Sequence, residues 1–129
     1  MDYELTIPTR WTDFDALGHL THAVYAEYLD EGRDDLLRRT VGDIKAWPNV
    51  VVHTSIDYRH EIALGVRTVV VHTRIAEIGR SSVRFAQTVT PAGGEVAAQA
   101  EAVLVAWDPS TRRSREITPE ERGKFTSAA

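Results

Sequence analysis

Apolar and polar residues alternate along five segments of the chain with the two-residue period of a β-strand. The apolar faces are, in chain order, Tyr3, Leu5, Ile7 and Trp11; Val50, Val52, Ile56 and Tyr58; Val69, Val71 and Ile75; Val83, Phe85 and Val89; and Val96, Ala98, Ala100, Ala102, Leu104 and Ala106. Each segment therefore predicts a strand with one face toward a core. Between the last two strands, TPAGGEV predicts a hairpin, because Gly93 and Gly94 tolerate positive φ. Gly65 and Gly79 mark the earlier turns.

The segment from His22 to Arg39 follows a helical period instead. Its apolar face consists of Tyr25, Tyr28, Leu29, Gly32 and Leu36. Thr21 is the expected N-cap, since its hydroxyl can accept a hydrogen bond from an early helical N–H. A short second helix is predicted near TPEER, with Thr118 as its cap and Pro119 at its first position.

Gly32 lies in the middle of the long helix, where glycine costs about 1 kcal/mol relative to alanine. A close approach by another backbone would explain it. The alanines of the fifth strand are the expected partner surface.

The order of elements is strand, long helix and four strands, and the short loops between those four strands predict antiparallel neighbours. One apolar helix face and one apolar sheet face must cover each other. We therefore expect an α+β domain over residues 1–129, with an antiparallel five-stranded sheet wrapped around one long central helix. The open sheet edges predict a homo-oligomer, a dimer or a tetramer.

Composition excludes several classes of protein. Hydrophobic residues make up 43% and charged residues 26% of the 129, which is typical of a globular domain rather than a disordered one. A net charge of -4 argues against nucleic-acid binding. The sequence has no apolar run of membrane-spanning length and no visible secretory signal. There are no cysteines, so thiolate chemistry is excluded and a cytoplasmic location is expected.

The segment just before the long helix carries more polar chemistry than a helix start requires. Asp13, Asp15, His19 and His22 fall within ten residues, together with Gly18. His19 and His22 lie three apart, but no third ligand has an obvious metal-binding spacing. We therefore expect no metal site.

The stretch DFDALGHLTHAVYAEYLDEGR resembles the active-site segment of hotdog-fold acyl-CoA thioesterases of the 4-hydroxybenzoyl-CoA thioesterase type. The resemblance continues through DYRHEIALG, TRIAEIGRSSVRFAQTV and GGEVAAQAEAVLVAWD, so that it covers most of the chain. The Asp-x-Asp-x-x-Gly segment is its most specific part.

The resemblance implies a role for several residues. Asp15 matches the catalytic carboxylate, which acts as nucleophile on the thioester carbonyl or as the base that activates water. His22 matches a functional histidine in one branch of the family, and its backbone N–H could polarise the thioester oxygen at the helix N-terminus. Gly18 would let the loop turn tightly. Asp13 is expected to be structural. Many relatives have two asparagines where this chain has Thr21 and His22, and an aspartate where it has Val66.

The same resemblance implies hydrolysis of an acyl-CoA or acyl-carrier thioester to free acid and thiol, with coenzyme A as part of the substrate rather than a separate cofactor. Basic residues should then surround the mouth of the site, where they would meet phosphates. The expected substrate-contacting residues are Gly18, His19, Tyr25, Arg59, His60, Arg80, Ser81, Ser82 and Arg84. Tyr25 and Tyr28 are also expected in the core. The site is expected to lie between subunits.

Two other functions stay open at this point. A non-catalytic acyl-CoA-binding or regulatory hotdog protein could keep the pocket without turnover, because fold does not determine function. A hotdog dehydratase is a further possibility, but its helix usually places Asp and His differently, and this chain resembles the thioesterase arrangement instead. The acyl group itself cannot be read from the sequence.

Overall fold

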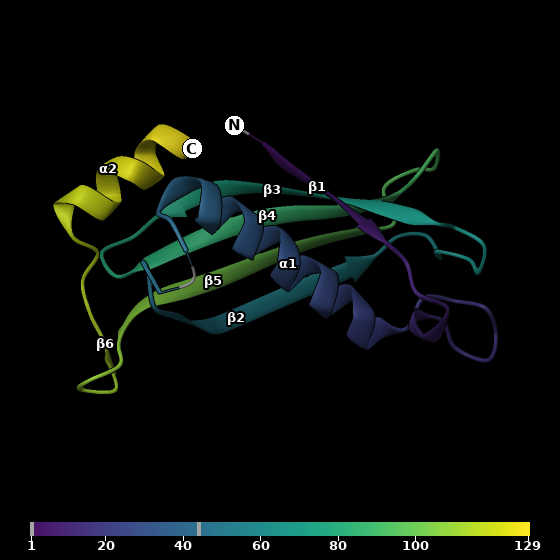
Figure 1. The fold of residues 1–129 in the computed structure, drawn as a ribbon, viewed down its shortest axis with the longest axis horizontal. Coiled ribbons are helices and arrows are strands. Elements are labelled where there is room, and N and C mark those ends of the chain that lie inside the picture. Colours follow the sequence, from purple (N-terminus) through teal and green to yellow (C-terminus); the bar gives the residue numbers. More distant parts are fainter. Residues whose placement is uncertain (1, 44) are drawn as a thin grey trace.

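The computed structural model of the chain describes residues 2–43 and 45–129. Its elements are, in chain order, β1 (Tyr3–Pro8), the 3-10 helix η1 (Trp11–Asp13), α1 (His22–Thr40), β2 (Asn49–Tyr58), β3 (Thr68–Ile78), β4 (Ser82–Pro91), β5 (Ala98–Asp108), β6 (Arg113–Ser114) and α2 (Pro119–Ala128). Helix α1 lies across the sheet, and α2 lies at the end of the sheet opposite η1 (Figure 1). The α+β class and the antiparallel sheet are confirmed, but α2 and the two-residue β6 go beyond a sheet packed on one helix.

The strand order is β1-β3-β4-β5-β2, with β6 beside β5, and every pairing is antiparallel. Antiparallel neighbours were expected throughout the last four strands, and this is wrong for β2 and β3. Strand β2 pairs with β5 at one edge, whereas β3 pairs with β1 and β4. The connection over residues 59–67 therefore crosses the end of the sheet. Backbone bonds hold it there, from Arg59 N to Ala97 O at 2.7 Å and from Leu20 N to Ile62 O at 2.9 Å.

The predicted inward faces of β3, β4 and β5 are confirmed, since Val71, Phe85 and Ala102 are at most 1% exposed. Three residues of the predicted inward faces are exposed instead. Tyr58, the last residue of the edge strand β2, is 44% exposed. Val52 is 58% exposed, because a bulge between Val51 and His53 changes the phase of β2. Trp11 is 81% exposed, because β1 ends at Pro8 and Trp11 begins η1.

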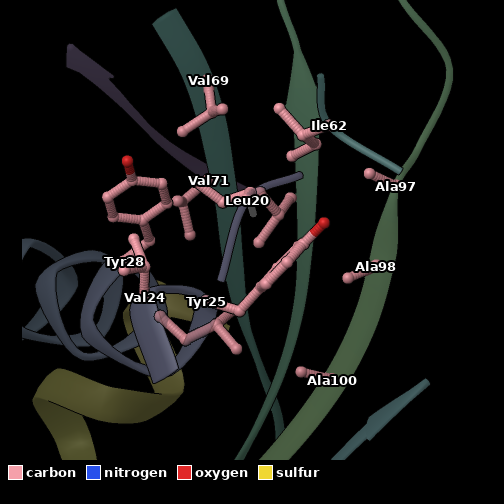
Figure 2. Packing of buried hydrophobic residues seen from close by; sticks show 12 residues of the cluster. Leu20, Val24, Tyr25, Tyr28, Ile62, Val69, Val71, Ala97, Ala98 and Ala100 are labelled. Atoms are coloured by element: carbon pink, nitrogen blue, oxygen red, sulfur yellow. The ribbon is translucent and has the colours of Figure 1, made fainter. Parts of the chain in front are cut away.

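Helix α1 begins where predicted and buries the predicted face. Thr21 occupies the N-cap position with an extended backbone, but its side chain makes no capping hydrogen bond, contrary to expectation. The first half of α1 packs in a cluster with Tyr25, Leu29 and Val71, and the second half in another with Leu36 and Phe85. In Figure 2, Tyr25 extends toward the alanines around the start of β5, while Tyr28 lies nearer Val69 and Val71. At α2 the predicted cap is confirmed, because Thr118 Oγ1 accepts from Glu121 N.

A polar layer separates the two clusters. Thr73 of β3 is paired with Gln87 of β4. This pair lies between the Val71–Val89 pair and the Ile75–Phe85 pair. Gln87 Nε2 donates to Leu29 O at 3.0 Å and to Thr73 Oγ1 at 2.9 Å. Its Oε1 accepts from Arg33 of α1 at 2.8 Å. These buried polar groups are bonded to one another, which avoids the penalty of an unpaired group in a core.

Gly32 faces this layer. A Cβ at Gly32 would lie 2.5 Å from Val71 Cγ1 and 2.8 Å from Thr73 Oγ1. The expected close approach at Gly32 is therefore present, but side chains of β3 and β4 make it, not the alanines of β5.

We predict that Gly32→Ala destabilises the protein by about 1–3 kcal/mol, because overpacking outweighs the gain in helix propensity. Gly123→Ala in α2 is the matched control, since nothing lies within 4 Å of a Cβ there, and it should leave stability equal or higher. Urea unfolding of both variants at one protein concentration checks this. Equal midpoints for Gly32→Ala and the parent would contradict the close approach.

Candidate active site

A small hairpin carries the two aspartates. Thr21 N donates to Asp13 O at 3.0 Å, and Asp15 N donates to His19 O at 2.8 Å. Phe14 and Leu20 form a bridge between these two bonds. At the tip, Gly18 has φ +77 and donates to Asp15 O at 3.0 Å. Only glycine adopts this backbone readily, so the tight turn expected at Gly18 is present.

The Asp15 carboxylate is exposed and held by its own turn. Its Oδ1 accepts from Leu17 N at 2.9 Å and from His19 N at 3.0 Å. The backbone hydrogen bond from His19 is the main reason that the pKa of Asp15 lies below its ordinary value of 3.8. Asp15 is therefore a carboxylate at neutral pH, with its second oxygen free of these two bonds.

Asp13 has the opposite environment, because it is 1% exposed. Burial raises its pKa, but hydrogen bonds from Tyr28 and Arg10 outweigh burial and leave the pKa below its ordinary value. The Asp13 side chain is thus saturated with protein donors, which agrees with the structural role expected for it.

The hairpin leads directly into the N-terminus of α1 at His22. The His22 ring stacks on Tyr58 at the end of β2, with ring centroids 4.6 Å apart. Tyr25 meets the same Tyr58 ring edge-on at 5.0 Å. These rings contribute to the wall of a cavity of about 250 Å³, which is lined by His19, Leu20, His22, Tyr25, Tyr58, Arg59, His60, Glu61 and Ile62.

Five of the residues proposed from the sequence therefore line one cavity: His19, His22, Tyr25, Arg59 and His60. Three of them are held by neighbours. His19 Nε2 lies 2.6 Å from Glu61 Oε2, and His60 Nε2 lies 3.1 Å from Glu95 Oε2. Arg59 donates to Gln99 at 3.0 Å.

The structure does not bring the other residues expected to contact phosphates to this cavity. Arg80, Ser81 and Ser82 lie at the turn between β3 and β4, where Arg80 Nε donates to Glu116 at 2.6 Å and Arg80 O accepts from Ile117 N. This turn belongs to the end of the sheet covered by α2, opposite the end that carries η1 (Figure 1). Arg84 is on the outer face of β4, paired with Glu101 at 3.4 Å. Within one chain, none of these residues reaches the Asp15 hairpin.

Sequence reasoning missed Tyr58, Glu61 and Ile62 as parts of the site. Tyr58 looked like one more alternating strand residue. A tyrosine at the last position of a strand, followed at once by Arg59 and His60, is the signal that could have placed it at the cavity.

A second, separate cavity of about 240 Å³ lies between α1 and β2, lined by Ala26, Leu29, Asp30, Arg33, Val51, Thr54, Ile56, Ala100 and Glu101. Its walls are mainly apolar. Arg33, which is 5% exposed, lines it as well, and its guanidinium pairs with Asp30.

Over residues 2–43 and 45–129, no three His, Asp or Glu side chains gather as metal ligands. No helix in the same ranges is long and apolar enough to span a membrane.

Comparisons with known proteins agree on one family. The family model described as thioesterase-like superfamily matches residues 9–125. A search of curated protein sequences found no match. Among solved structures, a thioesterase from Thermus thermophilus complexed with coenzyme A and Zn is 30% identical, with a TM-score of 0.87, over 97% of this chain and 92% of that one.

Two further solved structures have the same fold. The PA5185 protein from Pseudomonas aeruginosa is 28% identical over 98% of this chain and 90% of its own, with a TM-score of 0.84. A predicted thioesterase from Bacillus stearothermophilus is 23% identical, covers 100% of this chain and 97% of its own, and has a TM-score of 0.91. The chain therefore belongs to the thioesterase-like superfamily, among its hotdog-fold thioesterases.

Proposed function

We propose that this protein hydrolyses acyl-CoA thioesters and that Asp15 is its catalytic carboxylate. The observation that carries the proposal is an exposed, ionised carboxylate on a hairpin that runs into a helix N-terminus and the His22 cavity. The Thermus thermophilus thioesterase and a Staphylococcus aureus protein, SAV2348, were both solved in complex with coenzyme A, which supports this ligand class.

The helix N-terminus supplies the electrophilic half of the site. The first N–H groups of a helix have no partner within the helix, and the Thr21 side chain does not cap them. They can therefore donate to the thioester oxygen, with the positive end of the helix dipole behind them. Charge that develops on this oxygen in the transition state would be stabilised there.

Asp15 supplies the nucleophilic half. As a base, it takes a proton from water, whose oxygen attacks the carbonyl carbon, and the C–S bond then breaks to release the thiol. As a nucleophile, it attacks the carbon directly, the C–S bond breaks to release a thiolate that takes up a proton, and water then hydrolyses the resulting mixed anhydride to the free acid and Asp15. Both routes require the ionised carboxylate.

The acyl group would extend from this point along the groove between α1 and β2. The first cavity supplies aromatic walls from Tyr25 and Tyr58, and the second supplies the apolar side chains of Leu29 and Ile56. An acyl chain in this groove would lose its contact with water, which favours binding.

The coenzyme A end of the site would be completed by a second copy of the chain. Strand β2 is a sheet edge with exposed apolar residues, namely Val51, Val52 and Tyr58. If two β2 strands paired antiparallel about a twofold axis, the Asn49 end of one would meet the Tyr58 end of the other. Ser81 accepts from Ala106, which pairs with Asn49, so the Arg80 turn lies at that end. Pairing would thus bring Arg80 of the partner subunit toward the site.

The test of the proposed function is free-thiol release from short, long and aromatic acyl-CoAs without added metal. Asp15→Asn should lower kcat by about 10²-fold or more and leave the Kd for acyl-CoA nearly unchanged, because asparagine keeps the size but not the charge. Asp108→Asn is the control, since Asp108 is another turn aspartate of lowered pKa whose oxygen accepts from Ser110 N. Binding without turnover in the parent would support the non-catalytic alternative.

The pH dependence follows from the lowered pKa of Asp15. The carboxylate is the active form, so activity due to Asp15 is complete above its pKa and is lost only as pH falls through a value below 3.8. We predict that kcat/KM of the His22→Ala variant does not fall toward acid pH between about pH 5 and 8, because the Asp15 carboxylate stays ionised throughout this range. An acid limb near pH 6 in that variant would argue against Asp15 as the base.

The subunit arrangement predicts a dimer or tetramer of the 14.4 kDa chain in light scattering. Val52→Lys adds a charge to the β2 edge and should shift the protein toward the monomer, with a parallel loss of activity. Ser127→Lys on the exposed surface of α2 should do neither. A fully active monomer would refute a site shared between subunits.

A further inference from the structure

One buried titratable pair is not used by the proposed reaction. The Tyr28 hydroxyl donates to Asp13 Oδ2 at 2.6 Å, and the two residues are 4% and 1% exposed. A hydrogen bond from a hydroxyl to a carboxylate is charge-assisted, and such bonds are shorter and stronger than those between neutral groups. Burial, together with the Asp13 carboxylate, raises the pKa of Tyr28 above its usual range, so its hydroxyl stays a donor at any working pH.

Asp13 connects this bond to the start of the hairpin. Its carboxylate also accepts from Arg10 N at 2.9 Å and from Arg10 Nε at 3.0 Å. Its main-chain oxygen accepts from Thr21 N, the residue immediately before α1. A single residue therefore ties the turn of η1, the first residue before the helix and the second turn of the helix together.

Asp15 lies two residues further along the same hairpin strand. Phe14 between them is extended, with φ -105 and ψ 143. The pair of backbone bonds at Thr21–Asp13 and Asp15–His19 continues as one ladder. The place of Asp15 relative to the helix N-terminus is thus set from the base of the hairpin, where Asp13 is fixed.

We propose that Tyr28 is a positioning residue for catalysis, whose hydroxyl acts through Asp13 to hold the Asp15 carboxylate at its working distance from the N-terminus of α1. This inference rests on the proposed function. It gives the two aspartates of the Asp-x-Asp segment different tasks, an anchor and a reacting group. Displacement of a reacting group by about 1 Å can cost up to 10²-fold in rate, so loss of the anchor should be visible in kcat.

The kinetic test uses Tyr28→Phe, which removes only the hydroxyl. We expect kcat to fall about tenfold and KM to stay within about twofold, since binding contacts are untouched. Tyr3→Phe is the matched control at the other end of α1, where Tyr3 packs beside the second cluster, and it should leave kcat unchanged. Asp13→Asn and the double variant complete a cycle, in which the double variant should be no slower than Asp13→Asn alone.

A second readout does not depend on turnover. In folded Tyr28→Phe, the carboxyl pKa of Asp15, followed by carbon-13 NMR, should rise toward its ordinary value as the hairpin loosens around its Leu17 and His19 donors. If the parent protein hydrolyses no thioester, the proposed function fails, but this titration still decides whether Tyr28 holds Asp15. The inference is overturned by an unchanged Asp15 titration, or by lowered thermal stability with normal kcat.

Discussion

Everything at the site depends on how closely α1 can approach the sheet at Gly32. A hydrogen atom in place of a side chain lets the helix axis come down onto Val71 and Thr73. This contact sets the distance between the helix and the sheet. The Arg33–Gln87 and Gln87–Leu29 hydrogen bonds set the rotation of the helix and its position along the strands. A helix held in this way presents its first N–H groups in one defined place, which is what a site built on a helix end needs.

The proposed reaction depends on a contrast between two carboxylates of the same type. Asp13 is buried and fully engaged with donors of the protein, whereas Asp15 is exposed and engaged on one oxygen only. Both are held ionised, but for different reasons, since Asp13 has a tyrosine and an arginine beside it and Asp15 has two backbone amides. Asp13 has no capacity left for a substrate, and Asp15 does.

Local pattern predicted most of the elements and the inward faces of β3, β4 and β5, because alternation reports directly on a face buried against a helix. It failed where long-range pairing decides. No sequence pattern near Val52 indicates the bulge in β2. The short loops also gave no indication that residues 59–67 cross the end of the sheet. For the site, the sequence pointed to residues of both the hairpin and the 59–67 connection. The family resemblance identified the hairpin residues. The expectation of basic residues near the coenzyme A phosphates identified those of the connection. Within one chain Arg80 lies far from Asp15, and sequence could not show this, since the distance depends on which strands are neighbours.

The polar layer of Thr73, Gln87 and Arg33 divides the core into two compartments along one helix. Because the two clusters are separate, an apolar side chain on one side of the layer has its apolar contacts within its own cluster. The compartment around Tyr25 and Leu29 shapes the groove, and the compartment around Leu36 and Phe125 carries the C-terminal helix. If the proposed function holds, the acyl preference of such a domain can drift in evolution through substitutions in one half of the core, while the other half keeps the stability that tolerates them.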